Sequence, residues 1–422
     1  MIDFEFMLAK KRRASSITYK FRIIKQNGGY FMKKSKFASL FLSSSLLIGI
    51  LAGCGAEEGS SSEGGDTIKI GANLELSGAT ASYGTSEADA IDLAVEEIND
   101  AGGIDGKKIE LIKVDNKSDA AEATNAAIKL TSQDKVTAII GAATSGNSVA
   151  QVQIATDTKT PMISPSGTST TVTVGDDGKV NPFTFRTAFI DPFQGTVAAN
   201  FAANELKVKT AAVYADNASD YAKGLAASFI KDFEAAGGKI VAEESYVAKD
   251  TDFRSTLTNI KSSNPEFIFI PGYYEEVGLI VKQARELGIT VPLMGADGWD
   301  SPTLVDLAGA DALNNSFIIT AFSSEDPDGK AKDFSEKFKE KYGKDPNSFN
   351  ALGYDTVYLL KDAIERAGST DGTKIKEAIE ATDQLELVTG LYSVDENHHP
   401  IKSAVIIEYV DGAQVFKTKV NP

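Results

Sequence analysis

The sequence predicts an α/β protein with two lobes, each built on a parallel sheet. After Asp66, short β-branched runs alternate with segments of helical periodicity. Residues 87–99 place apolar side chains on one helical stripe, and Gly102 and Gly103 follow where such a helix should end. Strands separated by helices of about 10–15 residues favour βαβ units and parallel sheets.

The expected strands fall into two sets along the chain. The first set is 68–74, 108–114, 136–140 and 161–164, and the second is 211–214, 239–245, 267–271, 291–294 and 316–321. Residues 101–145 and 236–276 share one order of Gly-Gly, strand, helix, strand and loop. Two similar lobes would explain this shared order, although any βαβ protein repeats its elements in such a general order.

Residues 32–53 predict a lipoprotein signal peptide. Lys33, Lys34 and Lys36 precede an apolar run that is shorter than the roughly 20 residues of a membrane span. The run ends in Leu-Ala-Gly-Cys54, which resembles the lipobox of bacterial lipoproteins. We therefore expect lipidation of Cys54, and an extracytoplasmic protein anchored to the outer face of the cytoplasmic membrane of a Gram-positive bacterium.

The segments on either side of the signal peptide carry no fold of their own. Residues 54–66 are small and polar, which is typical of a flexible tether. Residues 1–31 match nothing that follows, and Met32 is the better start. We expect residues 1–31 to be a mis-annotated upstream segment.

Composition excludes several classes of function. The chain has 43 basic and 59 acidic residues, a net charge of −16, which disfavours nucleic-acid binding. Its histidines are the adjacent pair His398 and His399, and Cys54 is its single cysteine. A Cys-rich zinc site and an intrachain disulfide are excluded, and we expect no metal or cofactor. An enzyme is disfavoured, although a mechanism based on paired carboxylates stays open.

The loops after the first set of strands suit a carboxylate ligand. In a parallel sheet, ligands bind beyond the carboxyl ends of the strands. Residues 75–84, 141–148 and 165–169 offer small residues, hydroxyls and backbone N–H groups, and the last two contain no Lys or Arg. Helix N-termini there would attract an anion. Simple N-capping is the alternative for each Ser or Thr.

The loops after the second set of strands suit an ammonium group. Tyr221, Tyr273 and Asp297 follow three of these strands. A carboxylate among aromatic rings binds a cation by ion pairing and cation–π attraction. The two lobes together would hold a zwitterion, with Asp297 and Tyr221 on the ammonium. The alternative for Asp297 is a turn residue in Ala-Asp-Gly.

From Ile68 to about Val420 the chain resembles the leucine/isoleucine/valine-binding family of solute-binding proteins for ABC importers. The resemblance is carried by IGANLELSGATASYG (70–84), AIDLAVEEINDAGGIDGKKIELIKVDN (90–116), VTAIIGAATSGNS (136–148), TPMISPSGTS (160–169), YADNASDYAKGLA (214–226), the segment 253–288 and VPLMGADGW (291–299). It implies the type I periplasmic-binding-protein fold, in which two Rossmann-like lobes are joined by three hinge crossings and close on the ligand.

By family position, the lobes and crossings can be placed on the chain. The resemblance implies an N-terminal lobe of residues 67–187 and 322–390, and a C-terminal lobe of residues 188–321 and 391–422. It places the crossings near residues 186–190, 317–322 and 388–392.

The resemblance also implies roles for individual side chains. Ser145 and Thr168 match residues that hold the ligand carboxylate and ammonium, and Ser166 matches a position where the family uses a backbone group. Tyr83, Tyr221 and Tyr273 match pocket aromatics. Asp297 matches the acidic residue for the ammonium, which is Glu in the best-known members. Trp299 and Phe349 either border the pocket or pack in the core.

The function implied is capture of a small amino acid, foremost a branched-chain one, and its delivery to the membrane subunits of an ABC permease. We expect a monomer. Alternatives within the fold are another amino acid, an amide, urea or an aromatic acid as ligand, or a sensory module that presents its ligand to a receptor.

Overall fold

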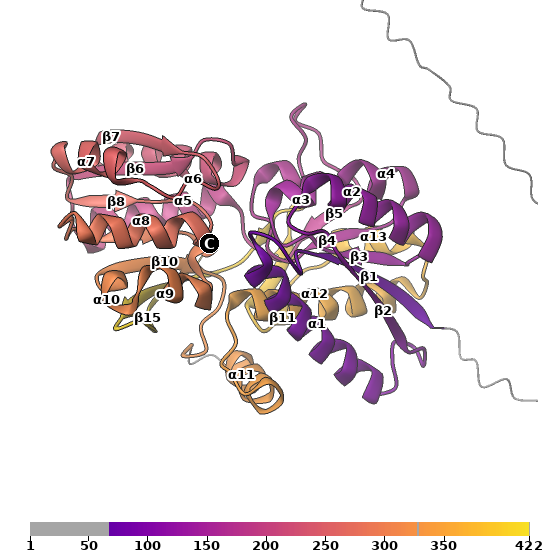
Figure 1. Cartoon of the computed structure of the whole chain (residues 1–422). Helices are drawn as coiled ribbons and strands as arrows, with labels where there is room; N and C mark the ends of the chain where they lie inside the picture. The colour runs from indigo at the N-terminus through magenta and orange to yellow at the C-terminus, as the bar shows by residue number, and fades with distance from the viewer. Residues whose placement is uncertain (1–66, 327–328, 422) are drawn as a thin grey trace, which may run out of the picture. The chain divides into compact units, whose positions relative to one another are not determined.

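The computed structural model describes residues 67–326 and 329–421 (Figure 1). The predictions for residues 1–66, including Cys54, lie outside these residues. Within the described part of the chain, no helix is both long and apolar enough to span a membrane.

The first sheet has five parallel strands in the order β2-β1-β3-β4-β5. The strands are β1 (Ile68–Leu74), β2 (Ile109–Asp115), β3 (Ala138–Ile140), β4 (Met162–Ser164) and β5 (Thr184–Arg186). This is one of the two common orders of doubly wound sheets, and it puts the carboxyl ends of all five strands at one edge. The loops predicted to carry the site therefore meet there.

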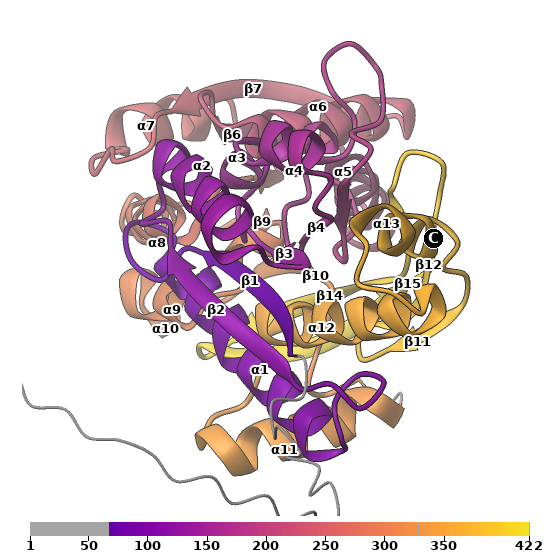
Figure 2. The same ribbon diagram turned by 90° about the vertical axis from the view of Figure 1, so that its right-hand side faces the viewer.

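Helices cover both faces of the first sheet (Figure 1). On one side lie α2 (Ala120–Ile128), η1 (Lys129–Asp134), α3 (Ser145–Val149) and α4 (Val152–Thr158), and η2 (Thr170–Val172) follows β4. On the other lie α1 (Ala81–Asp100), α11 (Gly329–Tyr342), α12 (Ser348–Ala367) and α13 (Gly372–Glu380), with α1 and α12 side by side (Figure 2). In β3, Ala138 and Ile140 pack toward α1 and α12, whereas Ile139 packs toward α2 and α4, as the two-residue period of a strand requires.

The second sheet repeats the same order and then extends it. Its strands run β7-β6-β8-β9-β10 in parallel, followed by the antiparallel β14 and β15. Their bounds are β6 (Thr210–Asp216), β7 (Lys239–Tyr246), β8 (Phe267–Phe269), β9 (Leu293–Gly295), β10 (Ser316–Thr320), β14 (Ala404–Val410) and β15 (Ala413–Val420). The shared strand order confirms that the repeated pattern in the sequence reflects two similar lobes.

The helices of the second lobe again lie on both faces. One core is formed with α5 (Asp191–Asn200), η3 (Phe201–Glu205) and α6 (Asp220–Ala235). The other is formed with α7 (Arg254–Ser262), α8 (Tyr274–Glu286), α9 (Pro302–Ala308) and α10 (Ala310–Leu313). The short η4 (Asp297–Trp299) follows β9 at the edge where the strands end.

The chain passes between the sheets three times. It leaves the first sheet after β5, leaves the second after β10, and returns to the second at β14. Before that return, β11 (Leu385–Leu387), β12 (Gly390–Val394) and β13 (Pro400–Ile401) form a separate three-stranded sheet, and Tyr392 packs into the core of the first lobe. The lobe boundaries remain a prediction, and these contacts favour a third crossing near residues 402–403.

All nine expected strands correspond to observed strands, with ends that differ by a few residues. The predicted helix over 87–99 lies within α1, which ends just before Gly102 and Gly103. The loop predicted over 75–84 is wrong at its end, because α1 already begins at Ala81. Tyr83 therefore lies on the first turn of a helix, and the helix axis fixes its direction.

Candidate functional site

A cavity of about 210 Å³ lies where the strand ends of the two lobes meet. Its lining residues are Tyr83, Ala143, Thr144, Ser145, Ser166, Thr168 and Phe349 from the first lobe, and Tyr221, Tyr273, Asp297 and Gly298 from the second. All seven residues predicted to bind ligand are among them. The cavity is small, and so suits a small ligand. The binding roles of these seven residues remain predictions.

A buried carboxylate organises the loop after β3. Glu75, the residue after β1, accepts bonds from the backbone N–H groups of Ala143 (2.9 Å) and Thr144 (3.0 Å). It also accepts from the Thr144 hydroxyl (2.6 Å) and from the Asn147 amide (2.9 Å). Four donors fit an ionised, acceptor-only carboxylate. The first turn of the loop is thus held by Glu75, and the N–H groups predicted to meet the ligand are partly occupied.

Ser145 keeps a donor for the cavity. It begins α3, is almost fully buried, and its Oγ accepts the backbone N–H of Ser169 at 3.1 Å. Among the described residues, no acceptor takes the Ser145 hydroxyl proton. That proton is available to an oxygen of a ligand.

Thr168 offers a second free hydroxyl on the same wall. Its Oγ1 is buried and has no hydrogen-bond partner in the part of the chain that the structure describes. Asp191 lies behind Thr168. Burial raises the pKa of Asp191 well above its usual value, and the nearby Thr168 hydroxyl opposes this rise, although the two side chains are not positioned to form a hydrogen bond. A buried hydroxyl without a partner is uncommon, and one in a cavity wall indicates a polar ligand.

Asp297 is the acidic group of the second wall. It begins η4, and its Oδ1 accepts from the Tyr221 hydroxyl and from the Gln194 amide, both at 2.9 Å. Its backbone N–H donates to Gln194 Oε1 at 3.1 Å, so that one amide holds both ends of the residue. Burial raises the pKa of Asp297 to about 6, while the bonds from Gln194 and Tyr221 oppose the rise. At neutral pH it is a carboxylate in need of a cation.

Aromatic rings from both lobes form the apolar wall. Tyr83 stacks on Phe349 with ring centroids 4.3 Å apart, and Tyr221 stacks on Tyr273 at 5.1 Å. Tyr83 also meets Tyr273 edge-on at 5.7 Å, which joins the two pairs. This surface suits an aliphatic group, and the Tyr221 hydroxyl joins it to the Asp297 carboxylate.

Hydrogen bonds across the lobes hold the cavity closed. The Tyr83 hydroxyl donates to the carbonyl of Gly298 and accepts the backbone N–H of Tyr274 at 3.2 Å. The hydroxyls of Ser82 and Ser301 share a bond at 2.7 Å. The structure is therefore the closed arrangement of the two lobes.

Trp299 does not line the cavity. Its indole is fully buried in a core of the second lobe, and Nε1 donates to the carbonyl of Ile270 at 2.9 Å. Of the two aromatic residues left open by the sequence, Phe349 borders the cavity and Trp299 packs in the core.

The histidine pair is also remote from the cavity lining. The ring nitrogens of buried His398 contact the Thr184 carbonyl (2.9 Å) and the Glu380 carboxylate (3.1 Å). Within residues 67–326 and 329–421, no cluster of three or more His, Cys, Asp or Glu side chains could hold a metal ion.

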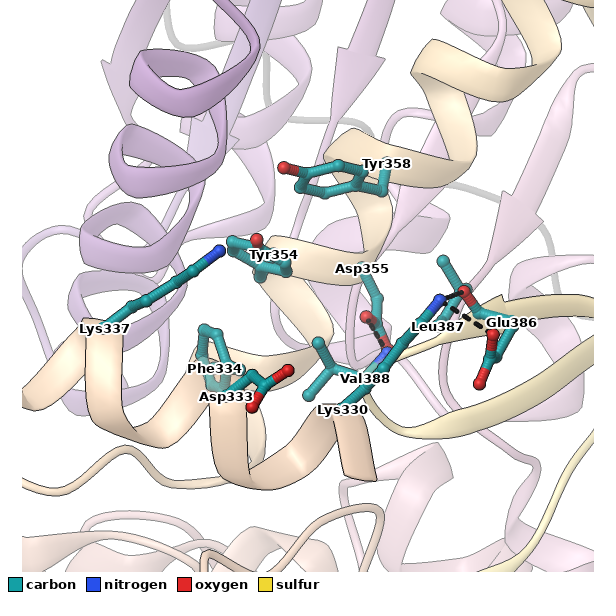
Figure 3. A pocket seen from close by; sticks show the side chains of 10 residues that line it. All are labelled: Lys330, Asp333, Phe334, Lys337, Tyr354, Asp355, Tyr358, Glu386, Leu387 and Val388. Atoms are coloured by element: carbon teal, nitrogen blue, oxygen red, sulfur yellow. Dashed lines mark hydrogen bonds and ion pairs between the residues drawn. The ribbon is translucent and has the colours of Figure 1, made fainter. Parts of the chain in front are cut away.

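A larger pocket of about 610 Å³ opens between α11, α12 and β11 (Figure 3). Its two lysines are already paired, Lys330 with Glu386 at 3.2 Å and Lys337 with Glu97 at 3.0 Å. Tyr354 and Tyr358 also donate to Glu97. The lysines and tyrosines of this pocket are thus engaged by Glu97 and Glu386.

Sequence reasoning missed the residues that hold the site from behind. Gln194, Glu75 and Glu87 are fully buried, and each bonds to a residue or loop of the cavity wall. Glu75 follows a predicted strand directly, which was a usable signal. Gln194 precedes Asp297 by 103 positions on a helix, and no local pattern connects the two.

The family described as periplasmic binding protein matches residues 67–414. The chain belongs to the periplasmic binding protein family. Its members are substrate-binding proteins of transport and not enzymes, and the predicted resemblance and fold are confirmed.

Individual relatives cover most of this family member. The leucine-, isoleucine-, valine-, threonine- and alanine-binding protein of Pseudomonas aeruginosa is 32% identical over 332 residues, which is 78% of this chain and 86% of that protein. The crystal structure of the branched-chain amino acid transporter substrate-binding protein LivJ from Streptococcus pneumoniae, in complex with isoleucine, is 42% identical. It has a TM-score of 0.80 and covers 84% of this chain and 100% of its own.

A second solved structure gives the same fold. The leucine-binding protein LivK from Thermotoga maritima is 38% identical, has a TM-score of 0.80, and covers 84% of this chain and 99% of its own. The two-lobe architecture of this chain is therefore that of amino-acid-binding members of the family.

Proposed function

We propose that this protein captures a small amino acid, foremost leucine, isoleucine or valine, and delivers it to the membrane subunits of an ABC importer. The observation that carries the proposal is the pairing of the Asp297 carboxylate with two free hydroxyls, Ser145 and Thr168, around one small cavity. A zwitterion satisfies all three groups at once.

Each end of the zwitterion has a wall of matching chemistry. The ammonium group donates to the Asp297 carboxylate and to the Thr168 oxygen, beside the faces of Tyr221 and Tyr273. The carboxylate accepts the Ser145 proton at the N-terminus of a helix-bearing loop. This assignment agrees with two of the relatives. One is named for binding leucine, isoleucine, valine, threonine and alanine, and the other was crystallised with isoleucine.

The side chain of the ligand lies against Tyr83 and Phe349. These stacked rings come from α1 and α12. The cavity that they border is too small for a large polar group. An aliphatic side chain of three or four carbons fits such a wall by apolar burial. An amide, urea or an aromatic acid would leave the Asp297 carboxylate without a cation.

Capture proceeds by closure of the lobes. A ligand that touches Ser145 and Thr168 on one side and Asp297 on the other binds the closed arrangement more tightly than the open one, and shifts the population toward it. We place the crossings near residues 187–190, 321–326 and 402–403, which follow β5, follow β10 and precede β14. A monomer suffices, since one chain supplies both walls.

The proposal includes the anchor predicted from the sequence. A lipid on Cys54 and a tether over residues 54–66 would hold the lobes near the permease on the outer face of the membrane. Labelling with a radioactive fatty acid, lost in Cys54→Ala, tests this part independently of ligand binding.

A thermal-shift screen tests the ligand class. The purified protein is heated with each of the twenty amino acids, urea, benzoate and choline. A ligand at 100 times its Kd should add about 2.7 kcal/mol of stability. We expect the largest shifts with leucine, isoleucine and valine. Silence from every amino acid in a folded sample, or a shift with benzoate or urea alone, would overturn the proposal.

A further inference from the structure

Ser166 contacts two oxygen atoms with a single hydroxyl. Its Oγ lies 2.5 Å from Oε1 of Glu87, on α1, and 2.8 Å from the carbonyl oxygen of Ala143, in the loop after β3. All three residues are buried, and Ser166 and Ala143 line the cavity. One proton must therefore serve two close oxygen–oxygen contacts.

A count of donors decides where the protons lie. A serine hydroxyl has one proton, and a backbone carbonyl can only accept. If Ser166 donates to Ala143, the short contact to Glu87 needs a proton from Glu87. If Ser166 donates to Glu87, two oxygens face each other at 2.8 Å with no proton between them. Both contacts are hydrogen bonds only when Glu87 is the donor.

We propose that Glu87 is held as a neutral carboxylic acid, which donates its proton to Ser166 while Ser166 donates to the carbonyl of Ala143. Glu87 is then a positioning residue for the first wall of the cavity. The chain of bonds ties α1 to the loops after β3 and β4, which carry Ser145 and Thr168.

The surroundings of Glu87 agree with a neutral side chain. Its Oε2 is buried without a partner among the residues described, which is far more costly for a carboxylate than for an acid. Burial, opposed by the Ser166 bond and reinforced by the charge of Glu75, raises the pKa of Glu87 well above its usual value. On the side of α12, the backbone oxygen of Glu87 would lie 2.9 Å from a Cβ at Gly353, so α1 and α12 pack closely at this position.

The neutral acid matters for the ligand, a step that rests on the proposed function. The first wall must accept the negative carboxylate of an amino acid, and it already contains the ionised Glu75. A second negative charge at Glu87 would oppose that ligand. The Ser166 proton is committed to Ala143, so Ser166 donates nothing to the ligand, and Ser145 is the hydroxyl that donates to the ligand carboxylate.

Infrared spectroscopy of the ligand-free protein tests the protonation state directly. At about pH 8, where an ordinary glutamate with a pKa near 4.3 is fully ionised, the wild type minus Glu87→Gln difference spectrum should contain the C=O band of a protonated carboxyl. Only carboxylate bands in that difference would overturn the proposal. Because no ligand is present, this result does not depend on the proposed function.

A second variant guards against a change in fold. In Ser166→Ala the acid loses its acceptor, and its C=O band should move to higher frequency while staying present. Circular dichroism confirms the fold of each variant. An unchanged band in Ser166→Ala would contradict the bond between the two residues.

Binding then tests the positioning role. An amide at position 87 still donates to Ser166, so Glu87→Gln should keep the affinity for isoleucine within about threefold, whereas Glu87→Leu should lose about tenfold or more. Equal losses in the two variants would show that a negative charge, rather than a donor, is needed. If no amino acid binds the wild type, the proposed function fails while the infrared result still stands.

Discussion

The Tyr83 hydroxyl of the first lobe donates a hydrogen bond to the carbonyl of Gly298 in the second, at 2.5 Å. The same oxygen accepts the backbone N–H of Tyr274, and the ring stacks on Phe349 over the cavity. One side chain thus lines the ligand site and joins the lobes. Lobe closure and formation of the ligand pocket are one event at this residue.

Tyr83→Phe should weaken ligand binding by about 5- to 150-fold. The variant keeps the ring but leaves a buried carbonyl and a buried N–H without partners, at a cost of about 1–3 kcal/mol in the closed state. Calorimetric titration with isoleucine measures the effect. Tyr409→Phe is the matched control, because Tyr409 donates to the carbonyl of Trp299 within the second lobe. It should lower thermal stability and leave the affinity nearly unchanged, and equal losses of affinity would contradict the role of Tyr83 in closure.

Asp297→Asn should abolish binding but stabilise the ligand-free protein. The native pKa of Asp297 is about 6, against 3.8 for an ordinary aspartate, so the native state binds the proton more tightly than the unfolded state. Stability is therefore lost as the pH rises from about 4 to 6, and the charged side chain costs up to about 3 kcal/mol at neutral pH.

Urea denaturation of the two proteins without ligand measures this cost. Asp297→Asn should be the more stable at neutral pH, and the difference should shrink toward about pH 4, where both side chains are neutral. Asp216→Asn provides a comparison at a buried aspartate of the second lobe that does not line the cavity. A variant that is less stable than the wild type at neutral pH would show that the buried charge of Asp297 does not destabilise the native state.

Gln194→Leu should move the pH dependence of binding upward. Binding needs the ionised form of Asp297, so affinity falls as the pH drops through the pKa of that carboxyl, which is about 6 in the wild type. The Gln194 bond lowers this pKa, and its loss raises it. Titrations with isoleucine between about pH 5 and 8 locate the midpoint. Gln283→Leu, a buried glutamine bonded to Thr251 and Phe253, should keep the wild-type midpoint, and the same midpoint in Gln194→Leu would disprove the coupling.

Ser145→Ala should weaken binding through the carboxylate end of the ligand. The variant removes a donor from the cavity and leaves the N–H of Ser169 without its acceptor. We expect a loss of about 1–3 kcal/mol for isoleucine, and a smaller loss for its amide, which lacks the anion. A loss of equal size for both ligands would show that Ser145 supports the loop and does not contact the carboxylate.

The strands and the loops that follow them could be predicted because both leave local patterns. Apolar β-branched runs mark β1, β3, β6 and β10, and the polar residues that follow such strands meet at one edge of a parallel sheet. That rule places Ser145 and Thr168 at one edge of the first sheet and Asp297 at one edge of the second. The resemblance to the family is what brings the two edges together around one ligand. Strands β5 and β11 to β15 were not among the predicted strands.

The residues behind the cavity could not be predicted in the same way. Glu75, Glu87 and Gln194 are polar side chains in buried positions, and a sequence pattern treats such residues as exposed. Their roles depend on contacts between elements far apart in the chain, such as the 103 positions between Gln194 and Asp297. The position of the Trp299 indole could not be predicted either, since only the packing of the folded chain shows that it lies in the core.

The most direct test of the account is calorimetric titration with three ligands that differ at one group. They are isoleucine, isoleucinamide without the carboxylate, and the 2-hydroxy acid that carries a hydroxyl in place of the ammonium. We predict that isoleucine binds and that each analogue binds at least about 30-fold more weakly, since each leaves a buried charged or donor group unpaired. An analogue that binds as tightly as isoleucine would show that its missing charge is not recognised, and would contradict a site built for a zwitterion between Ser145 and Asp297.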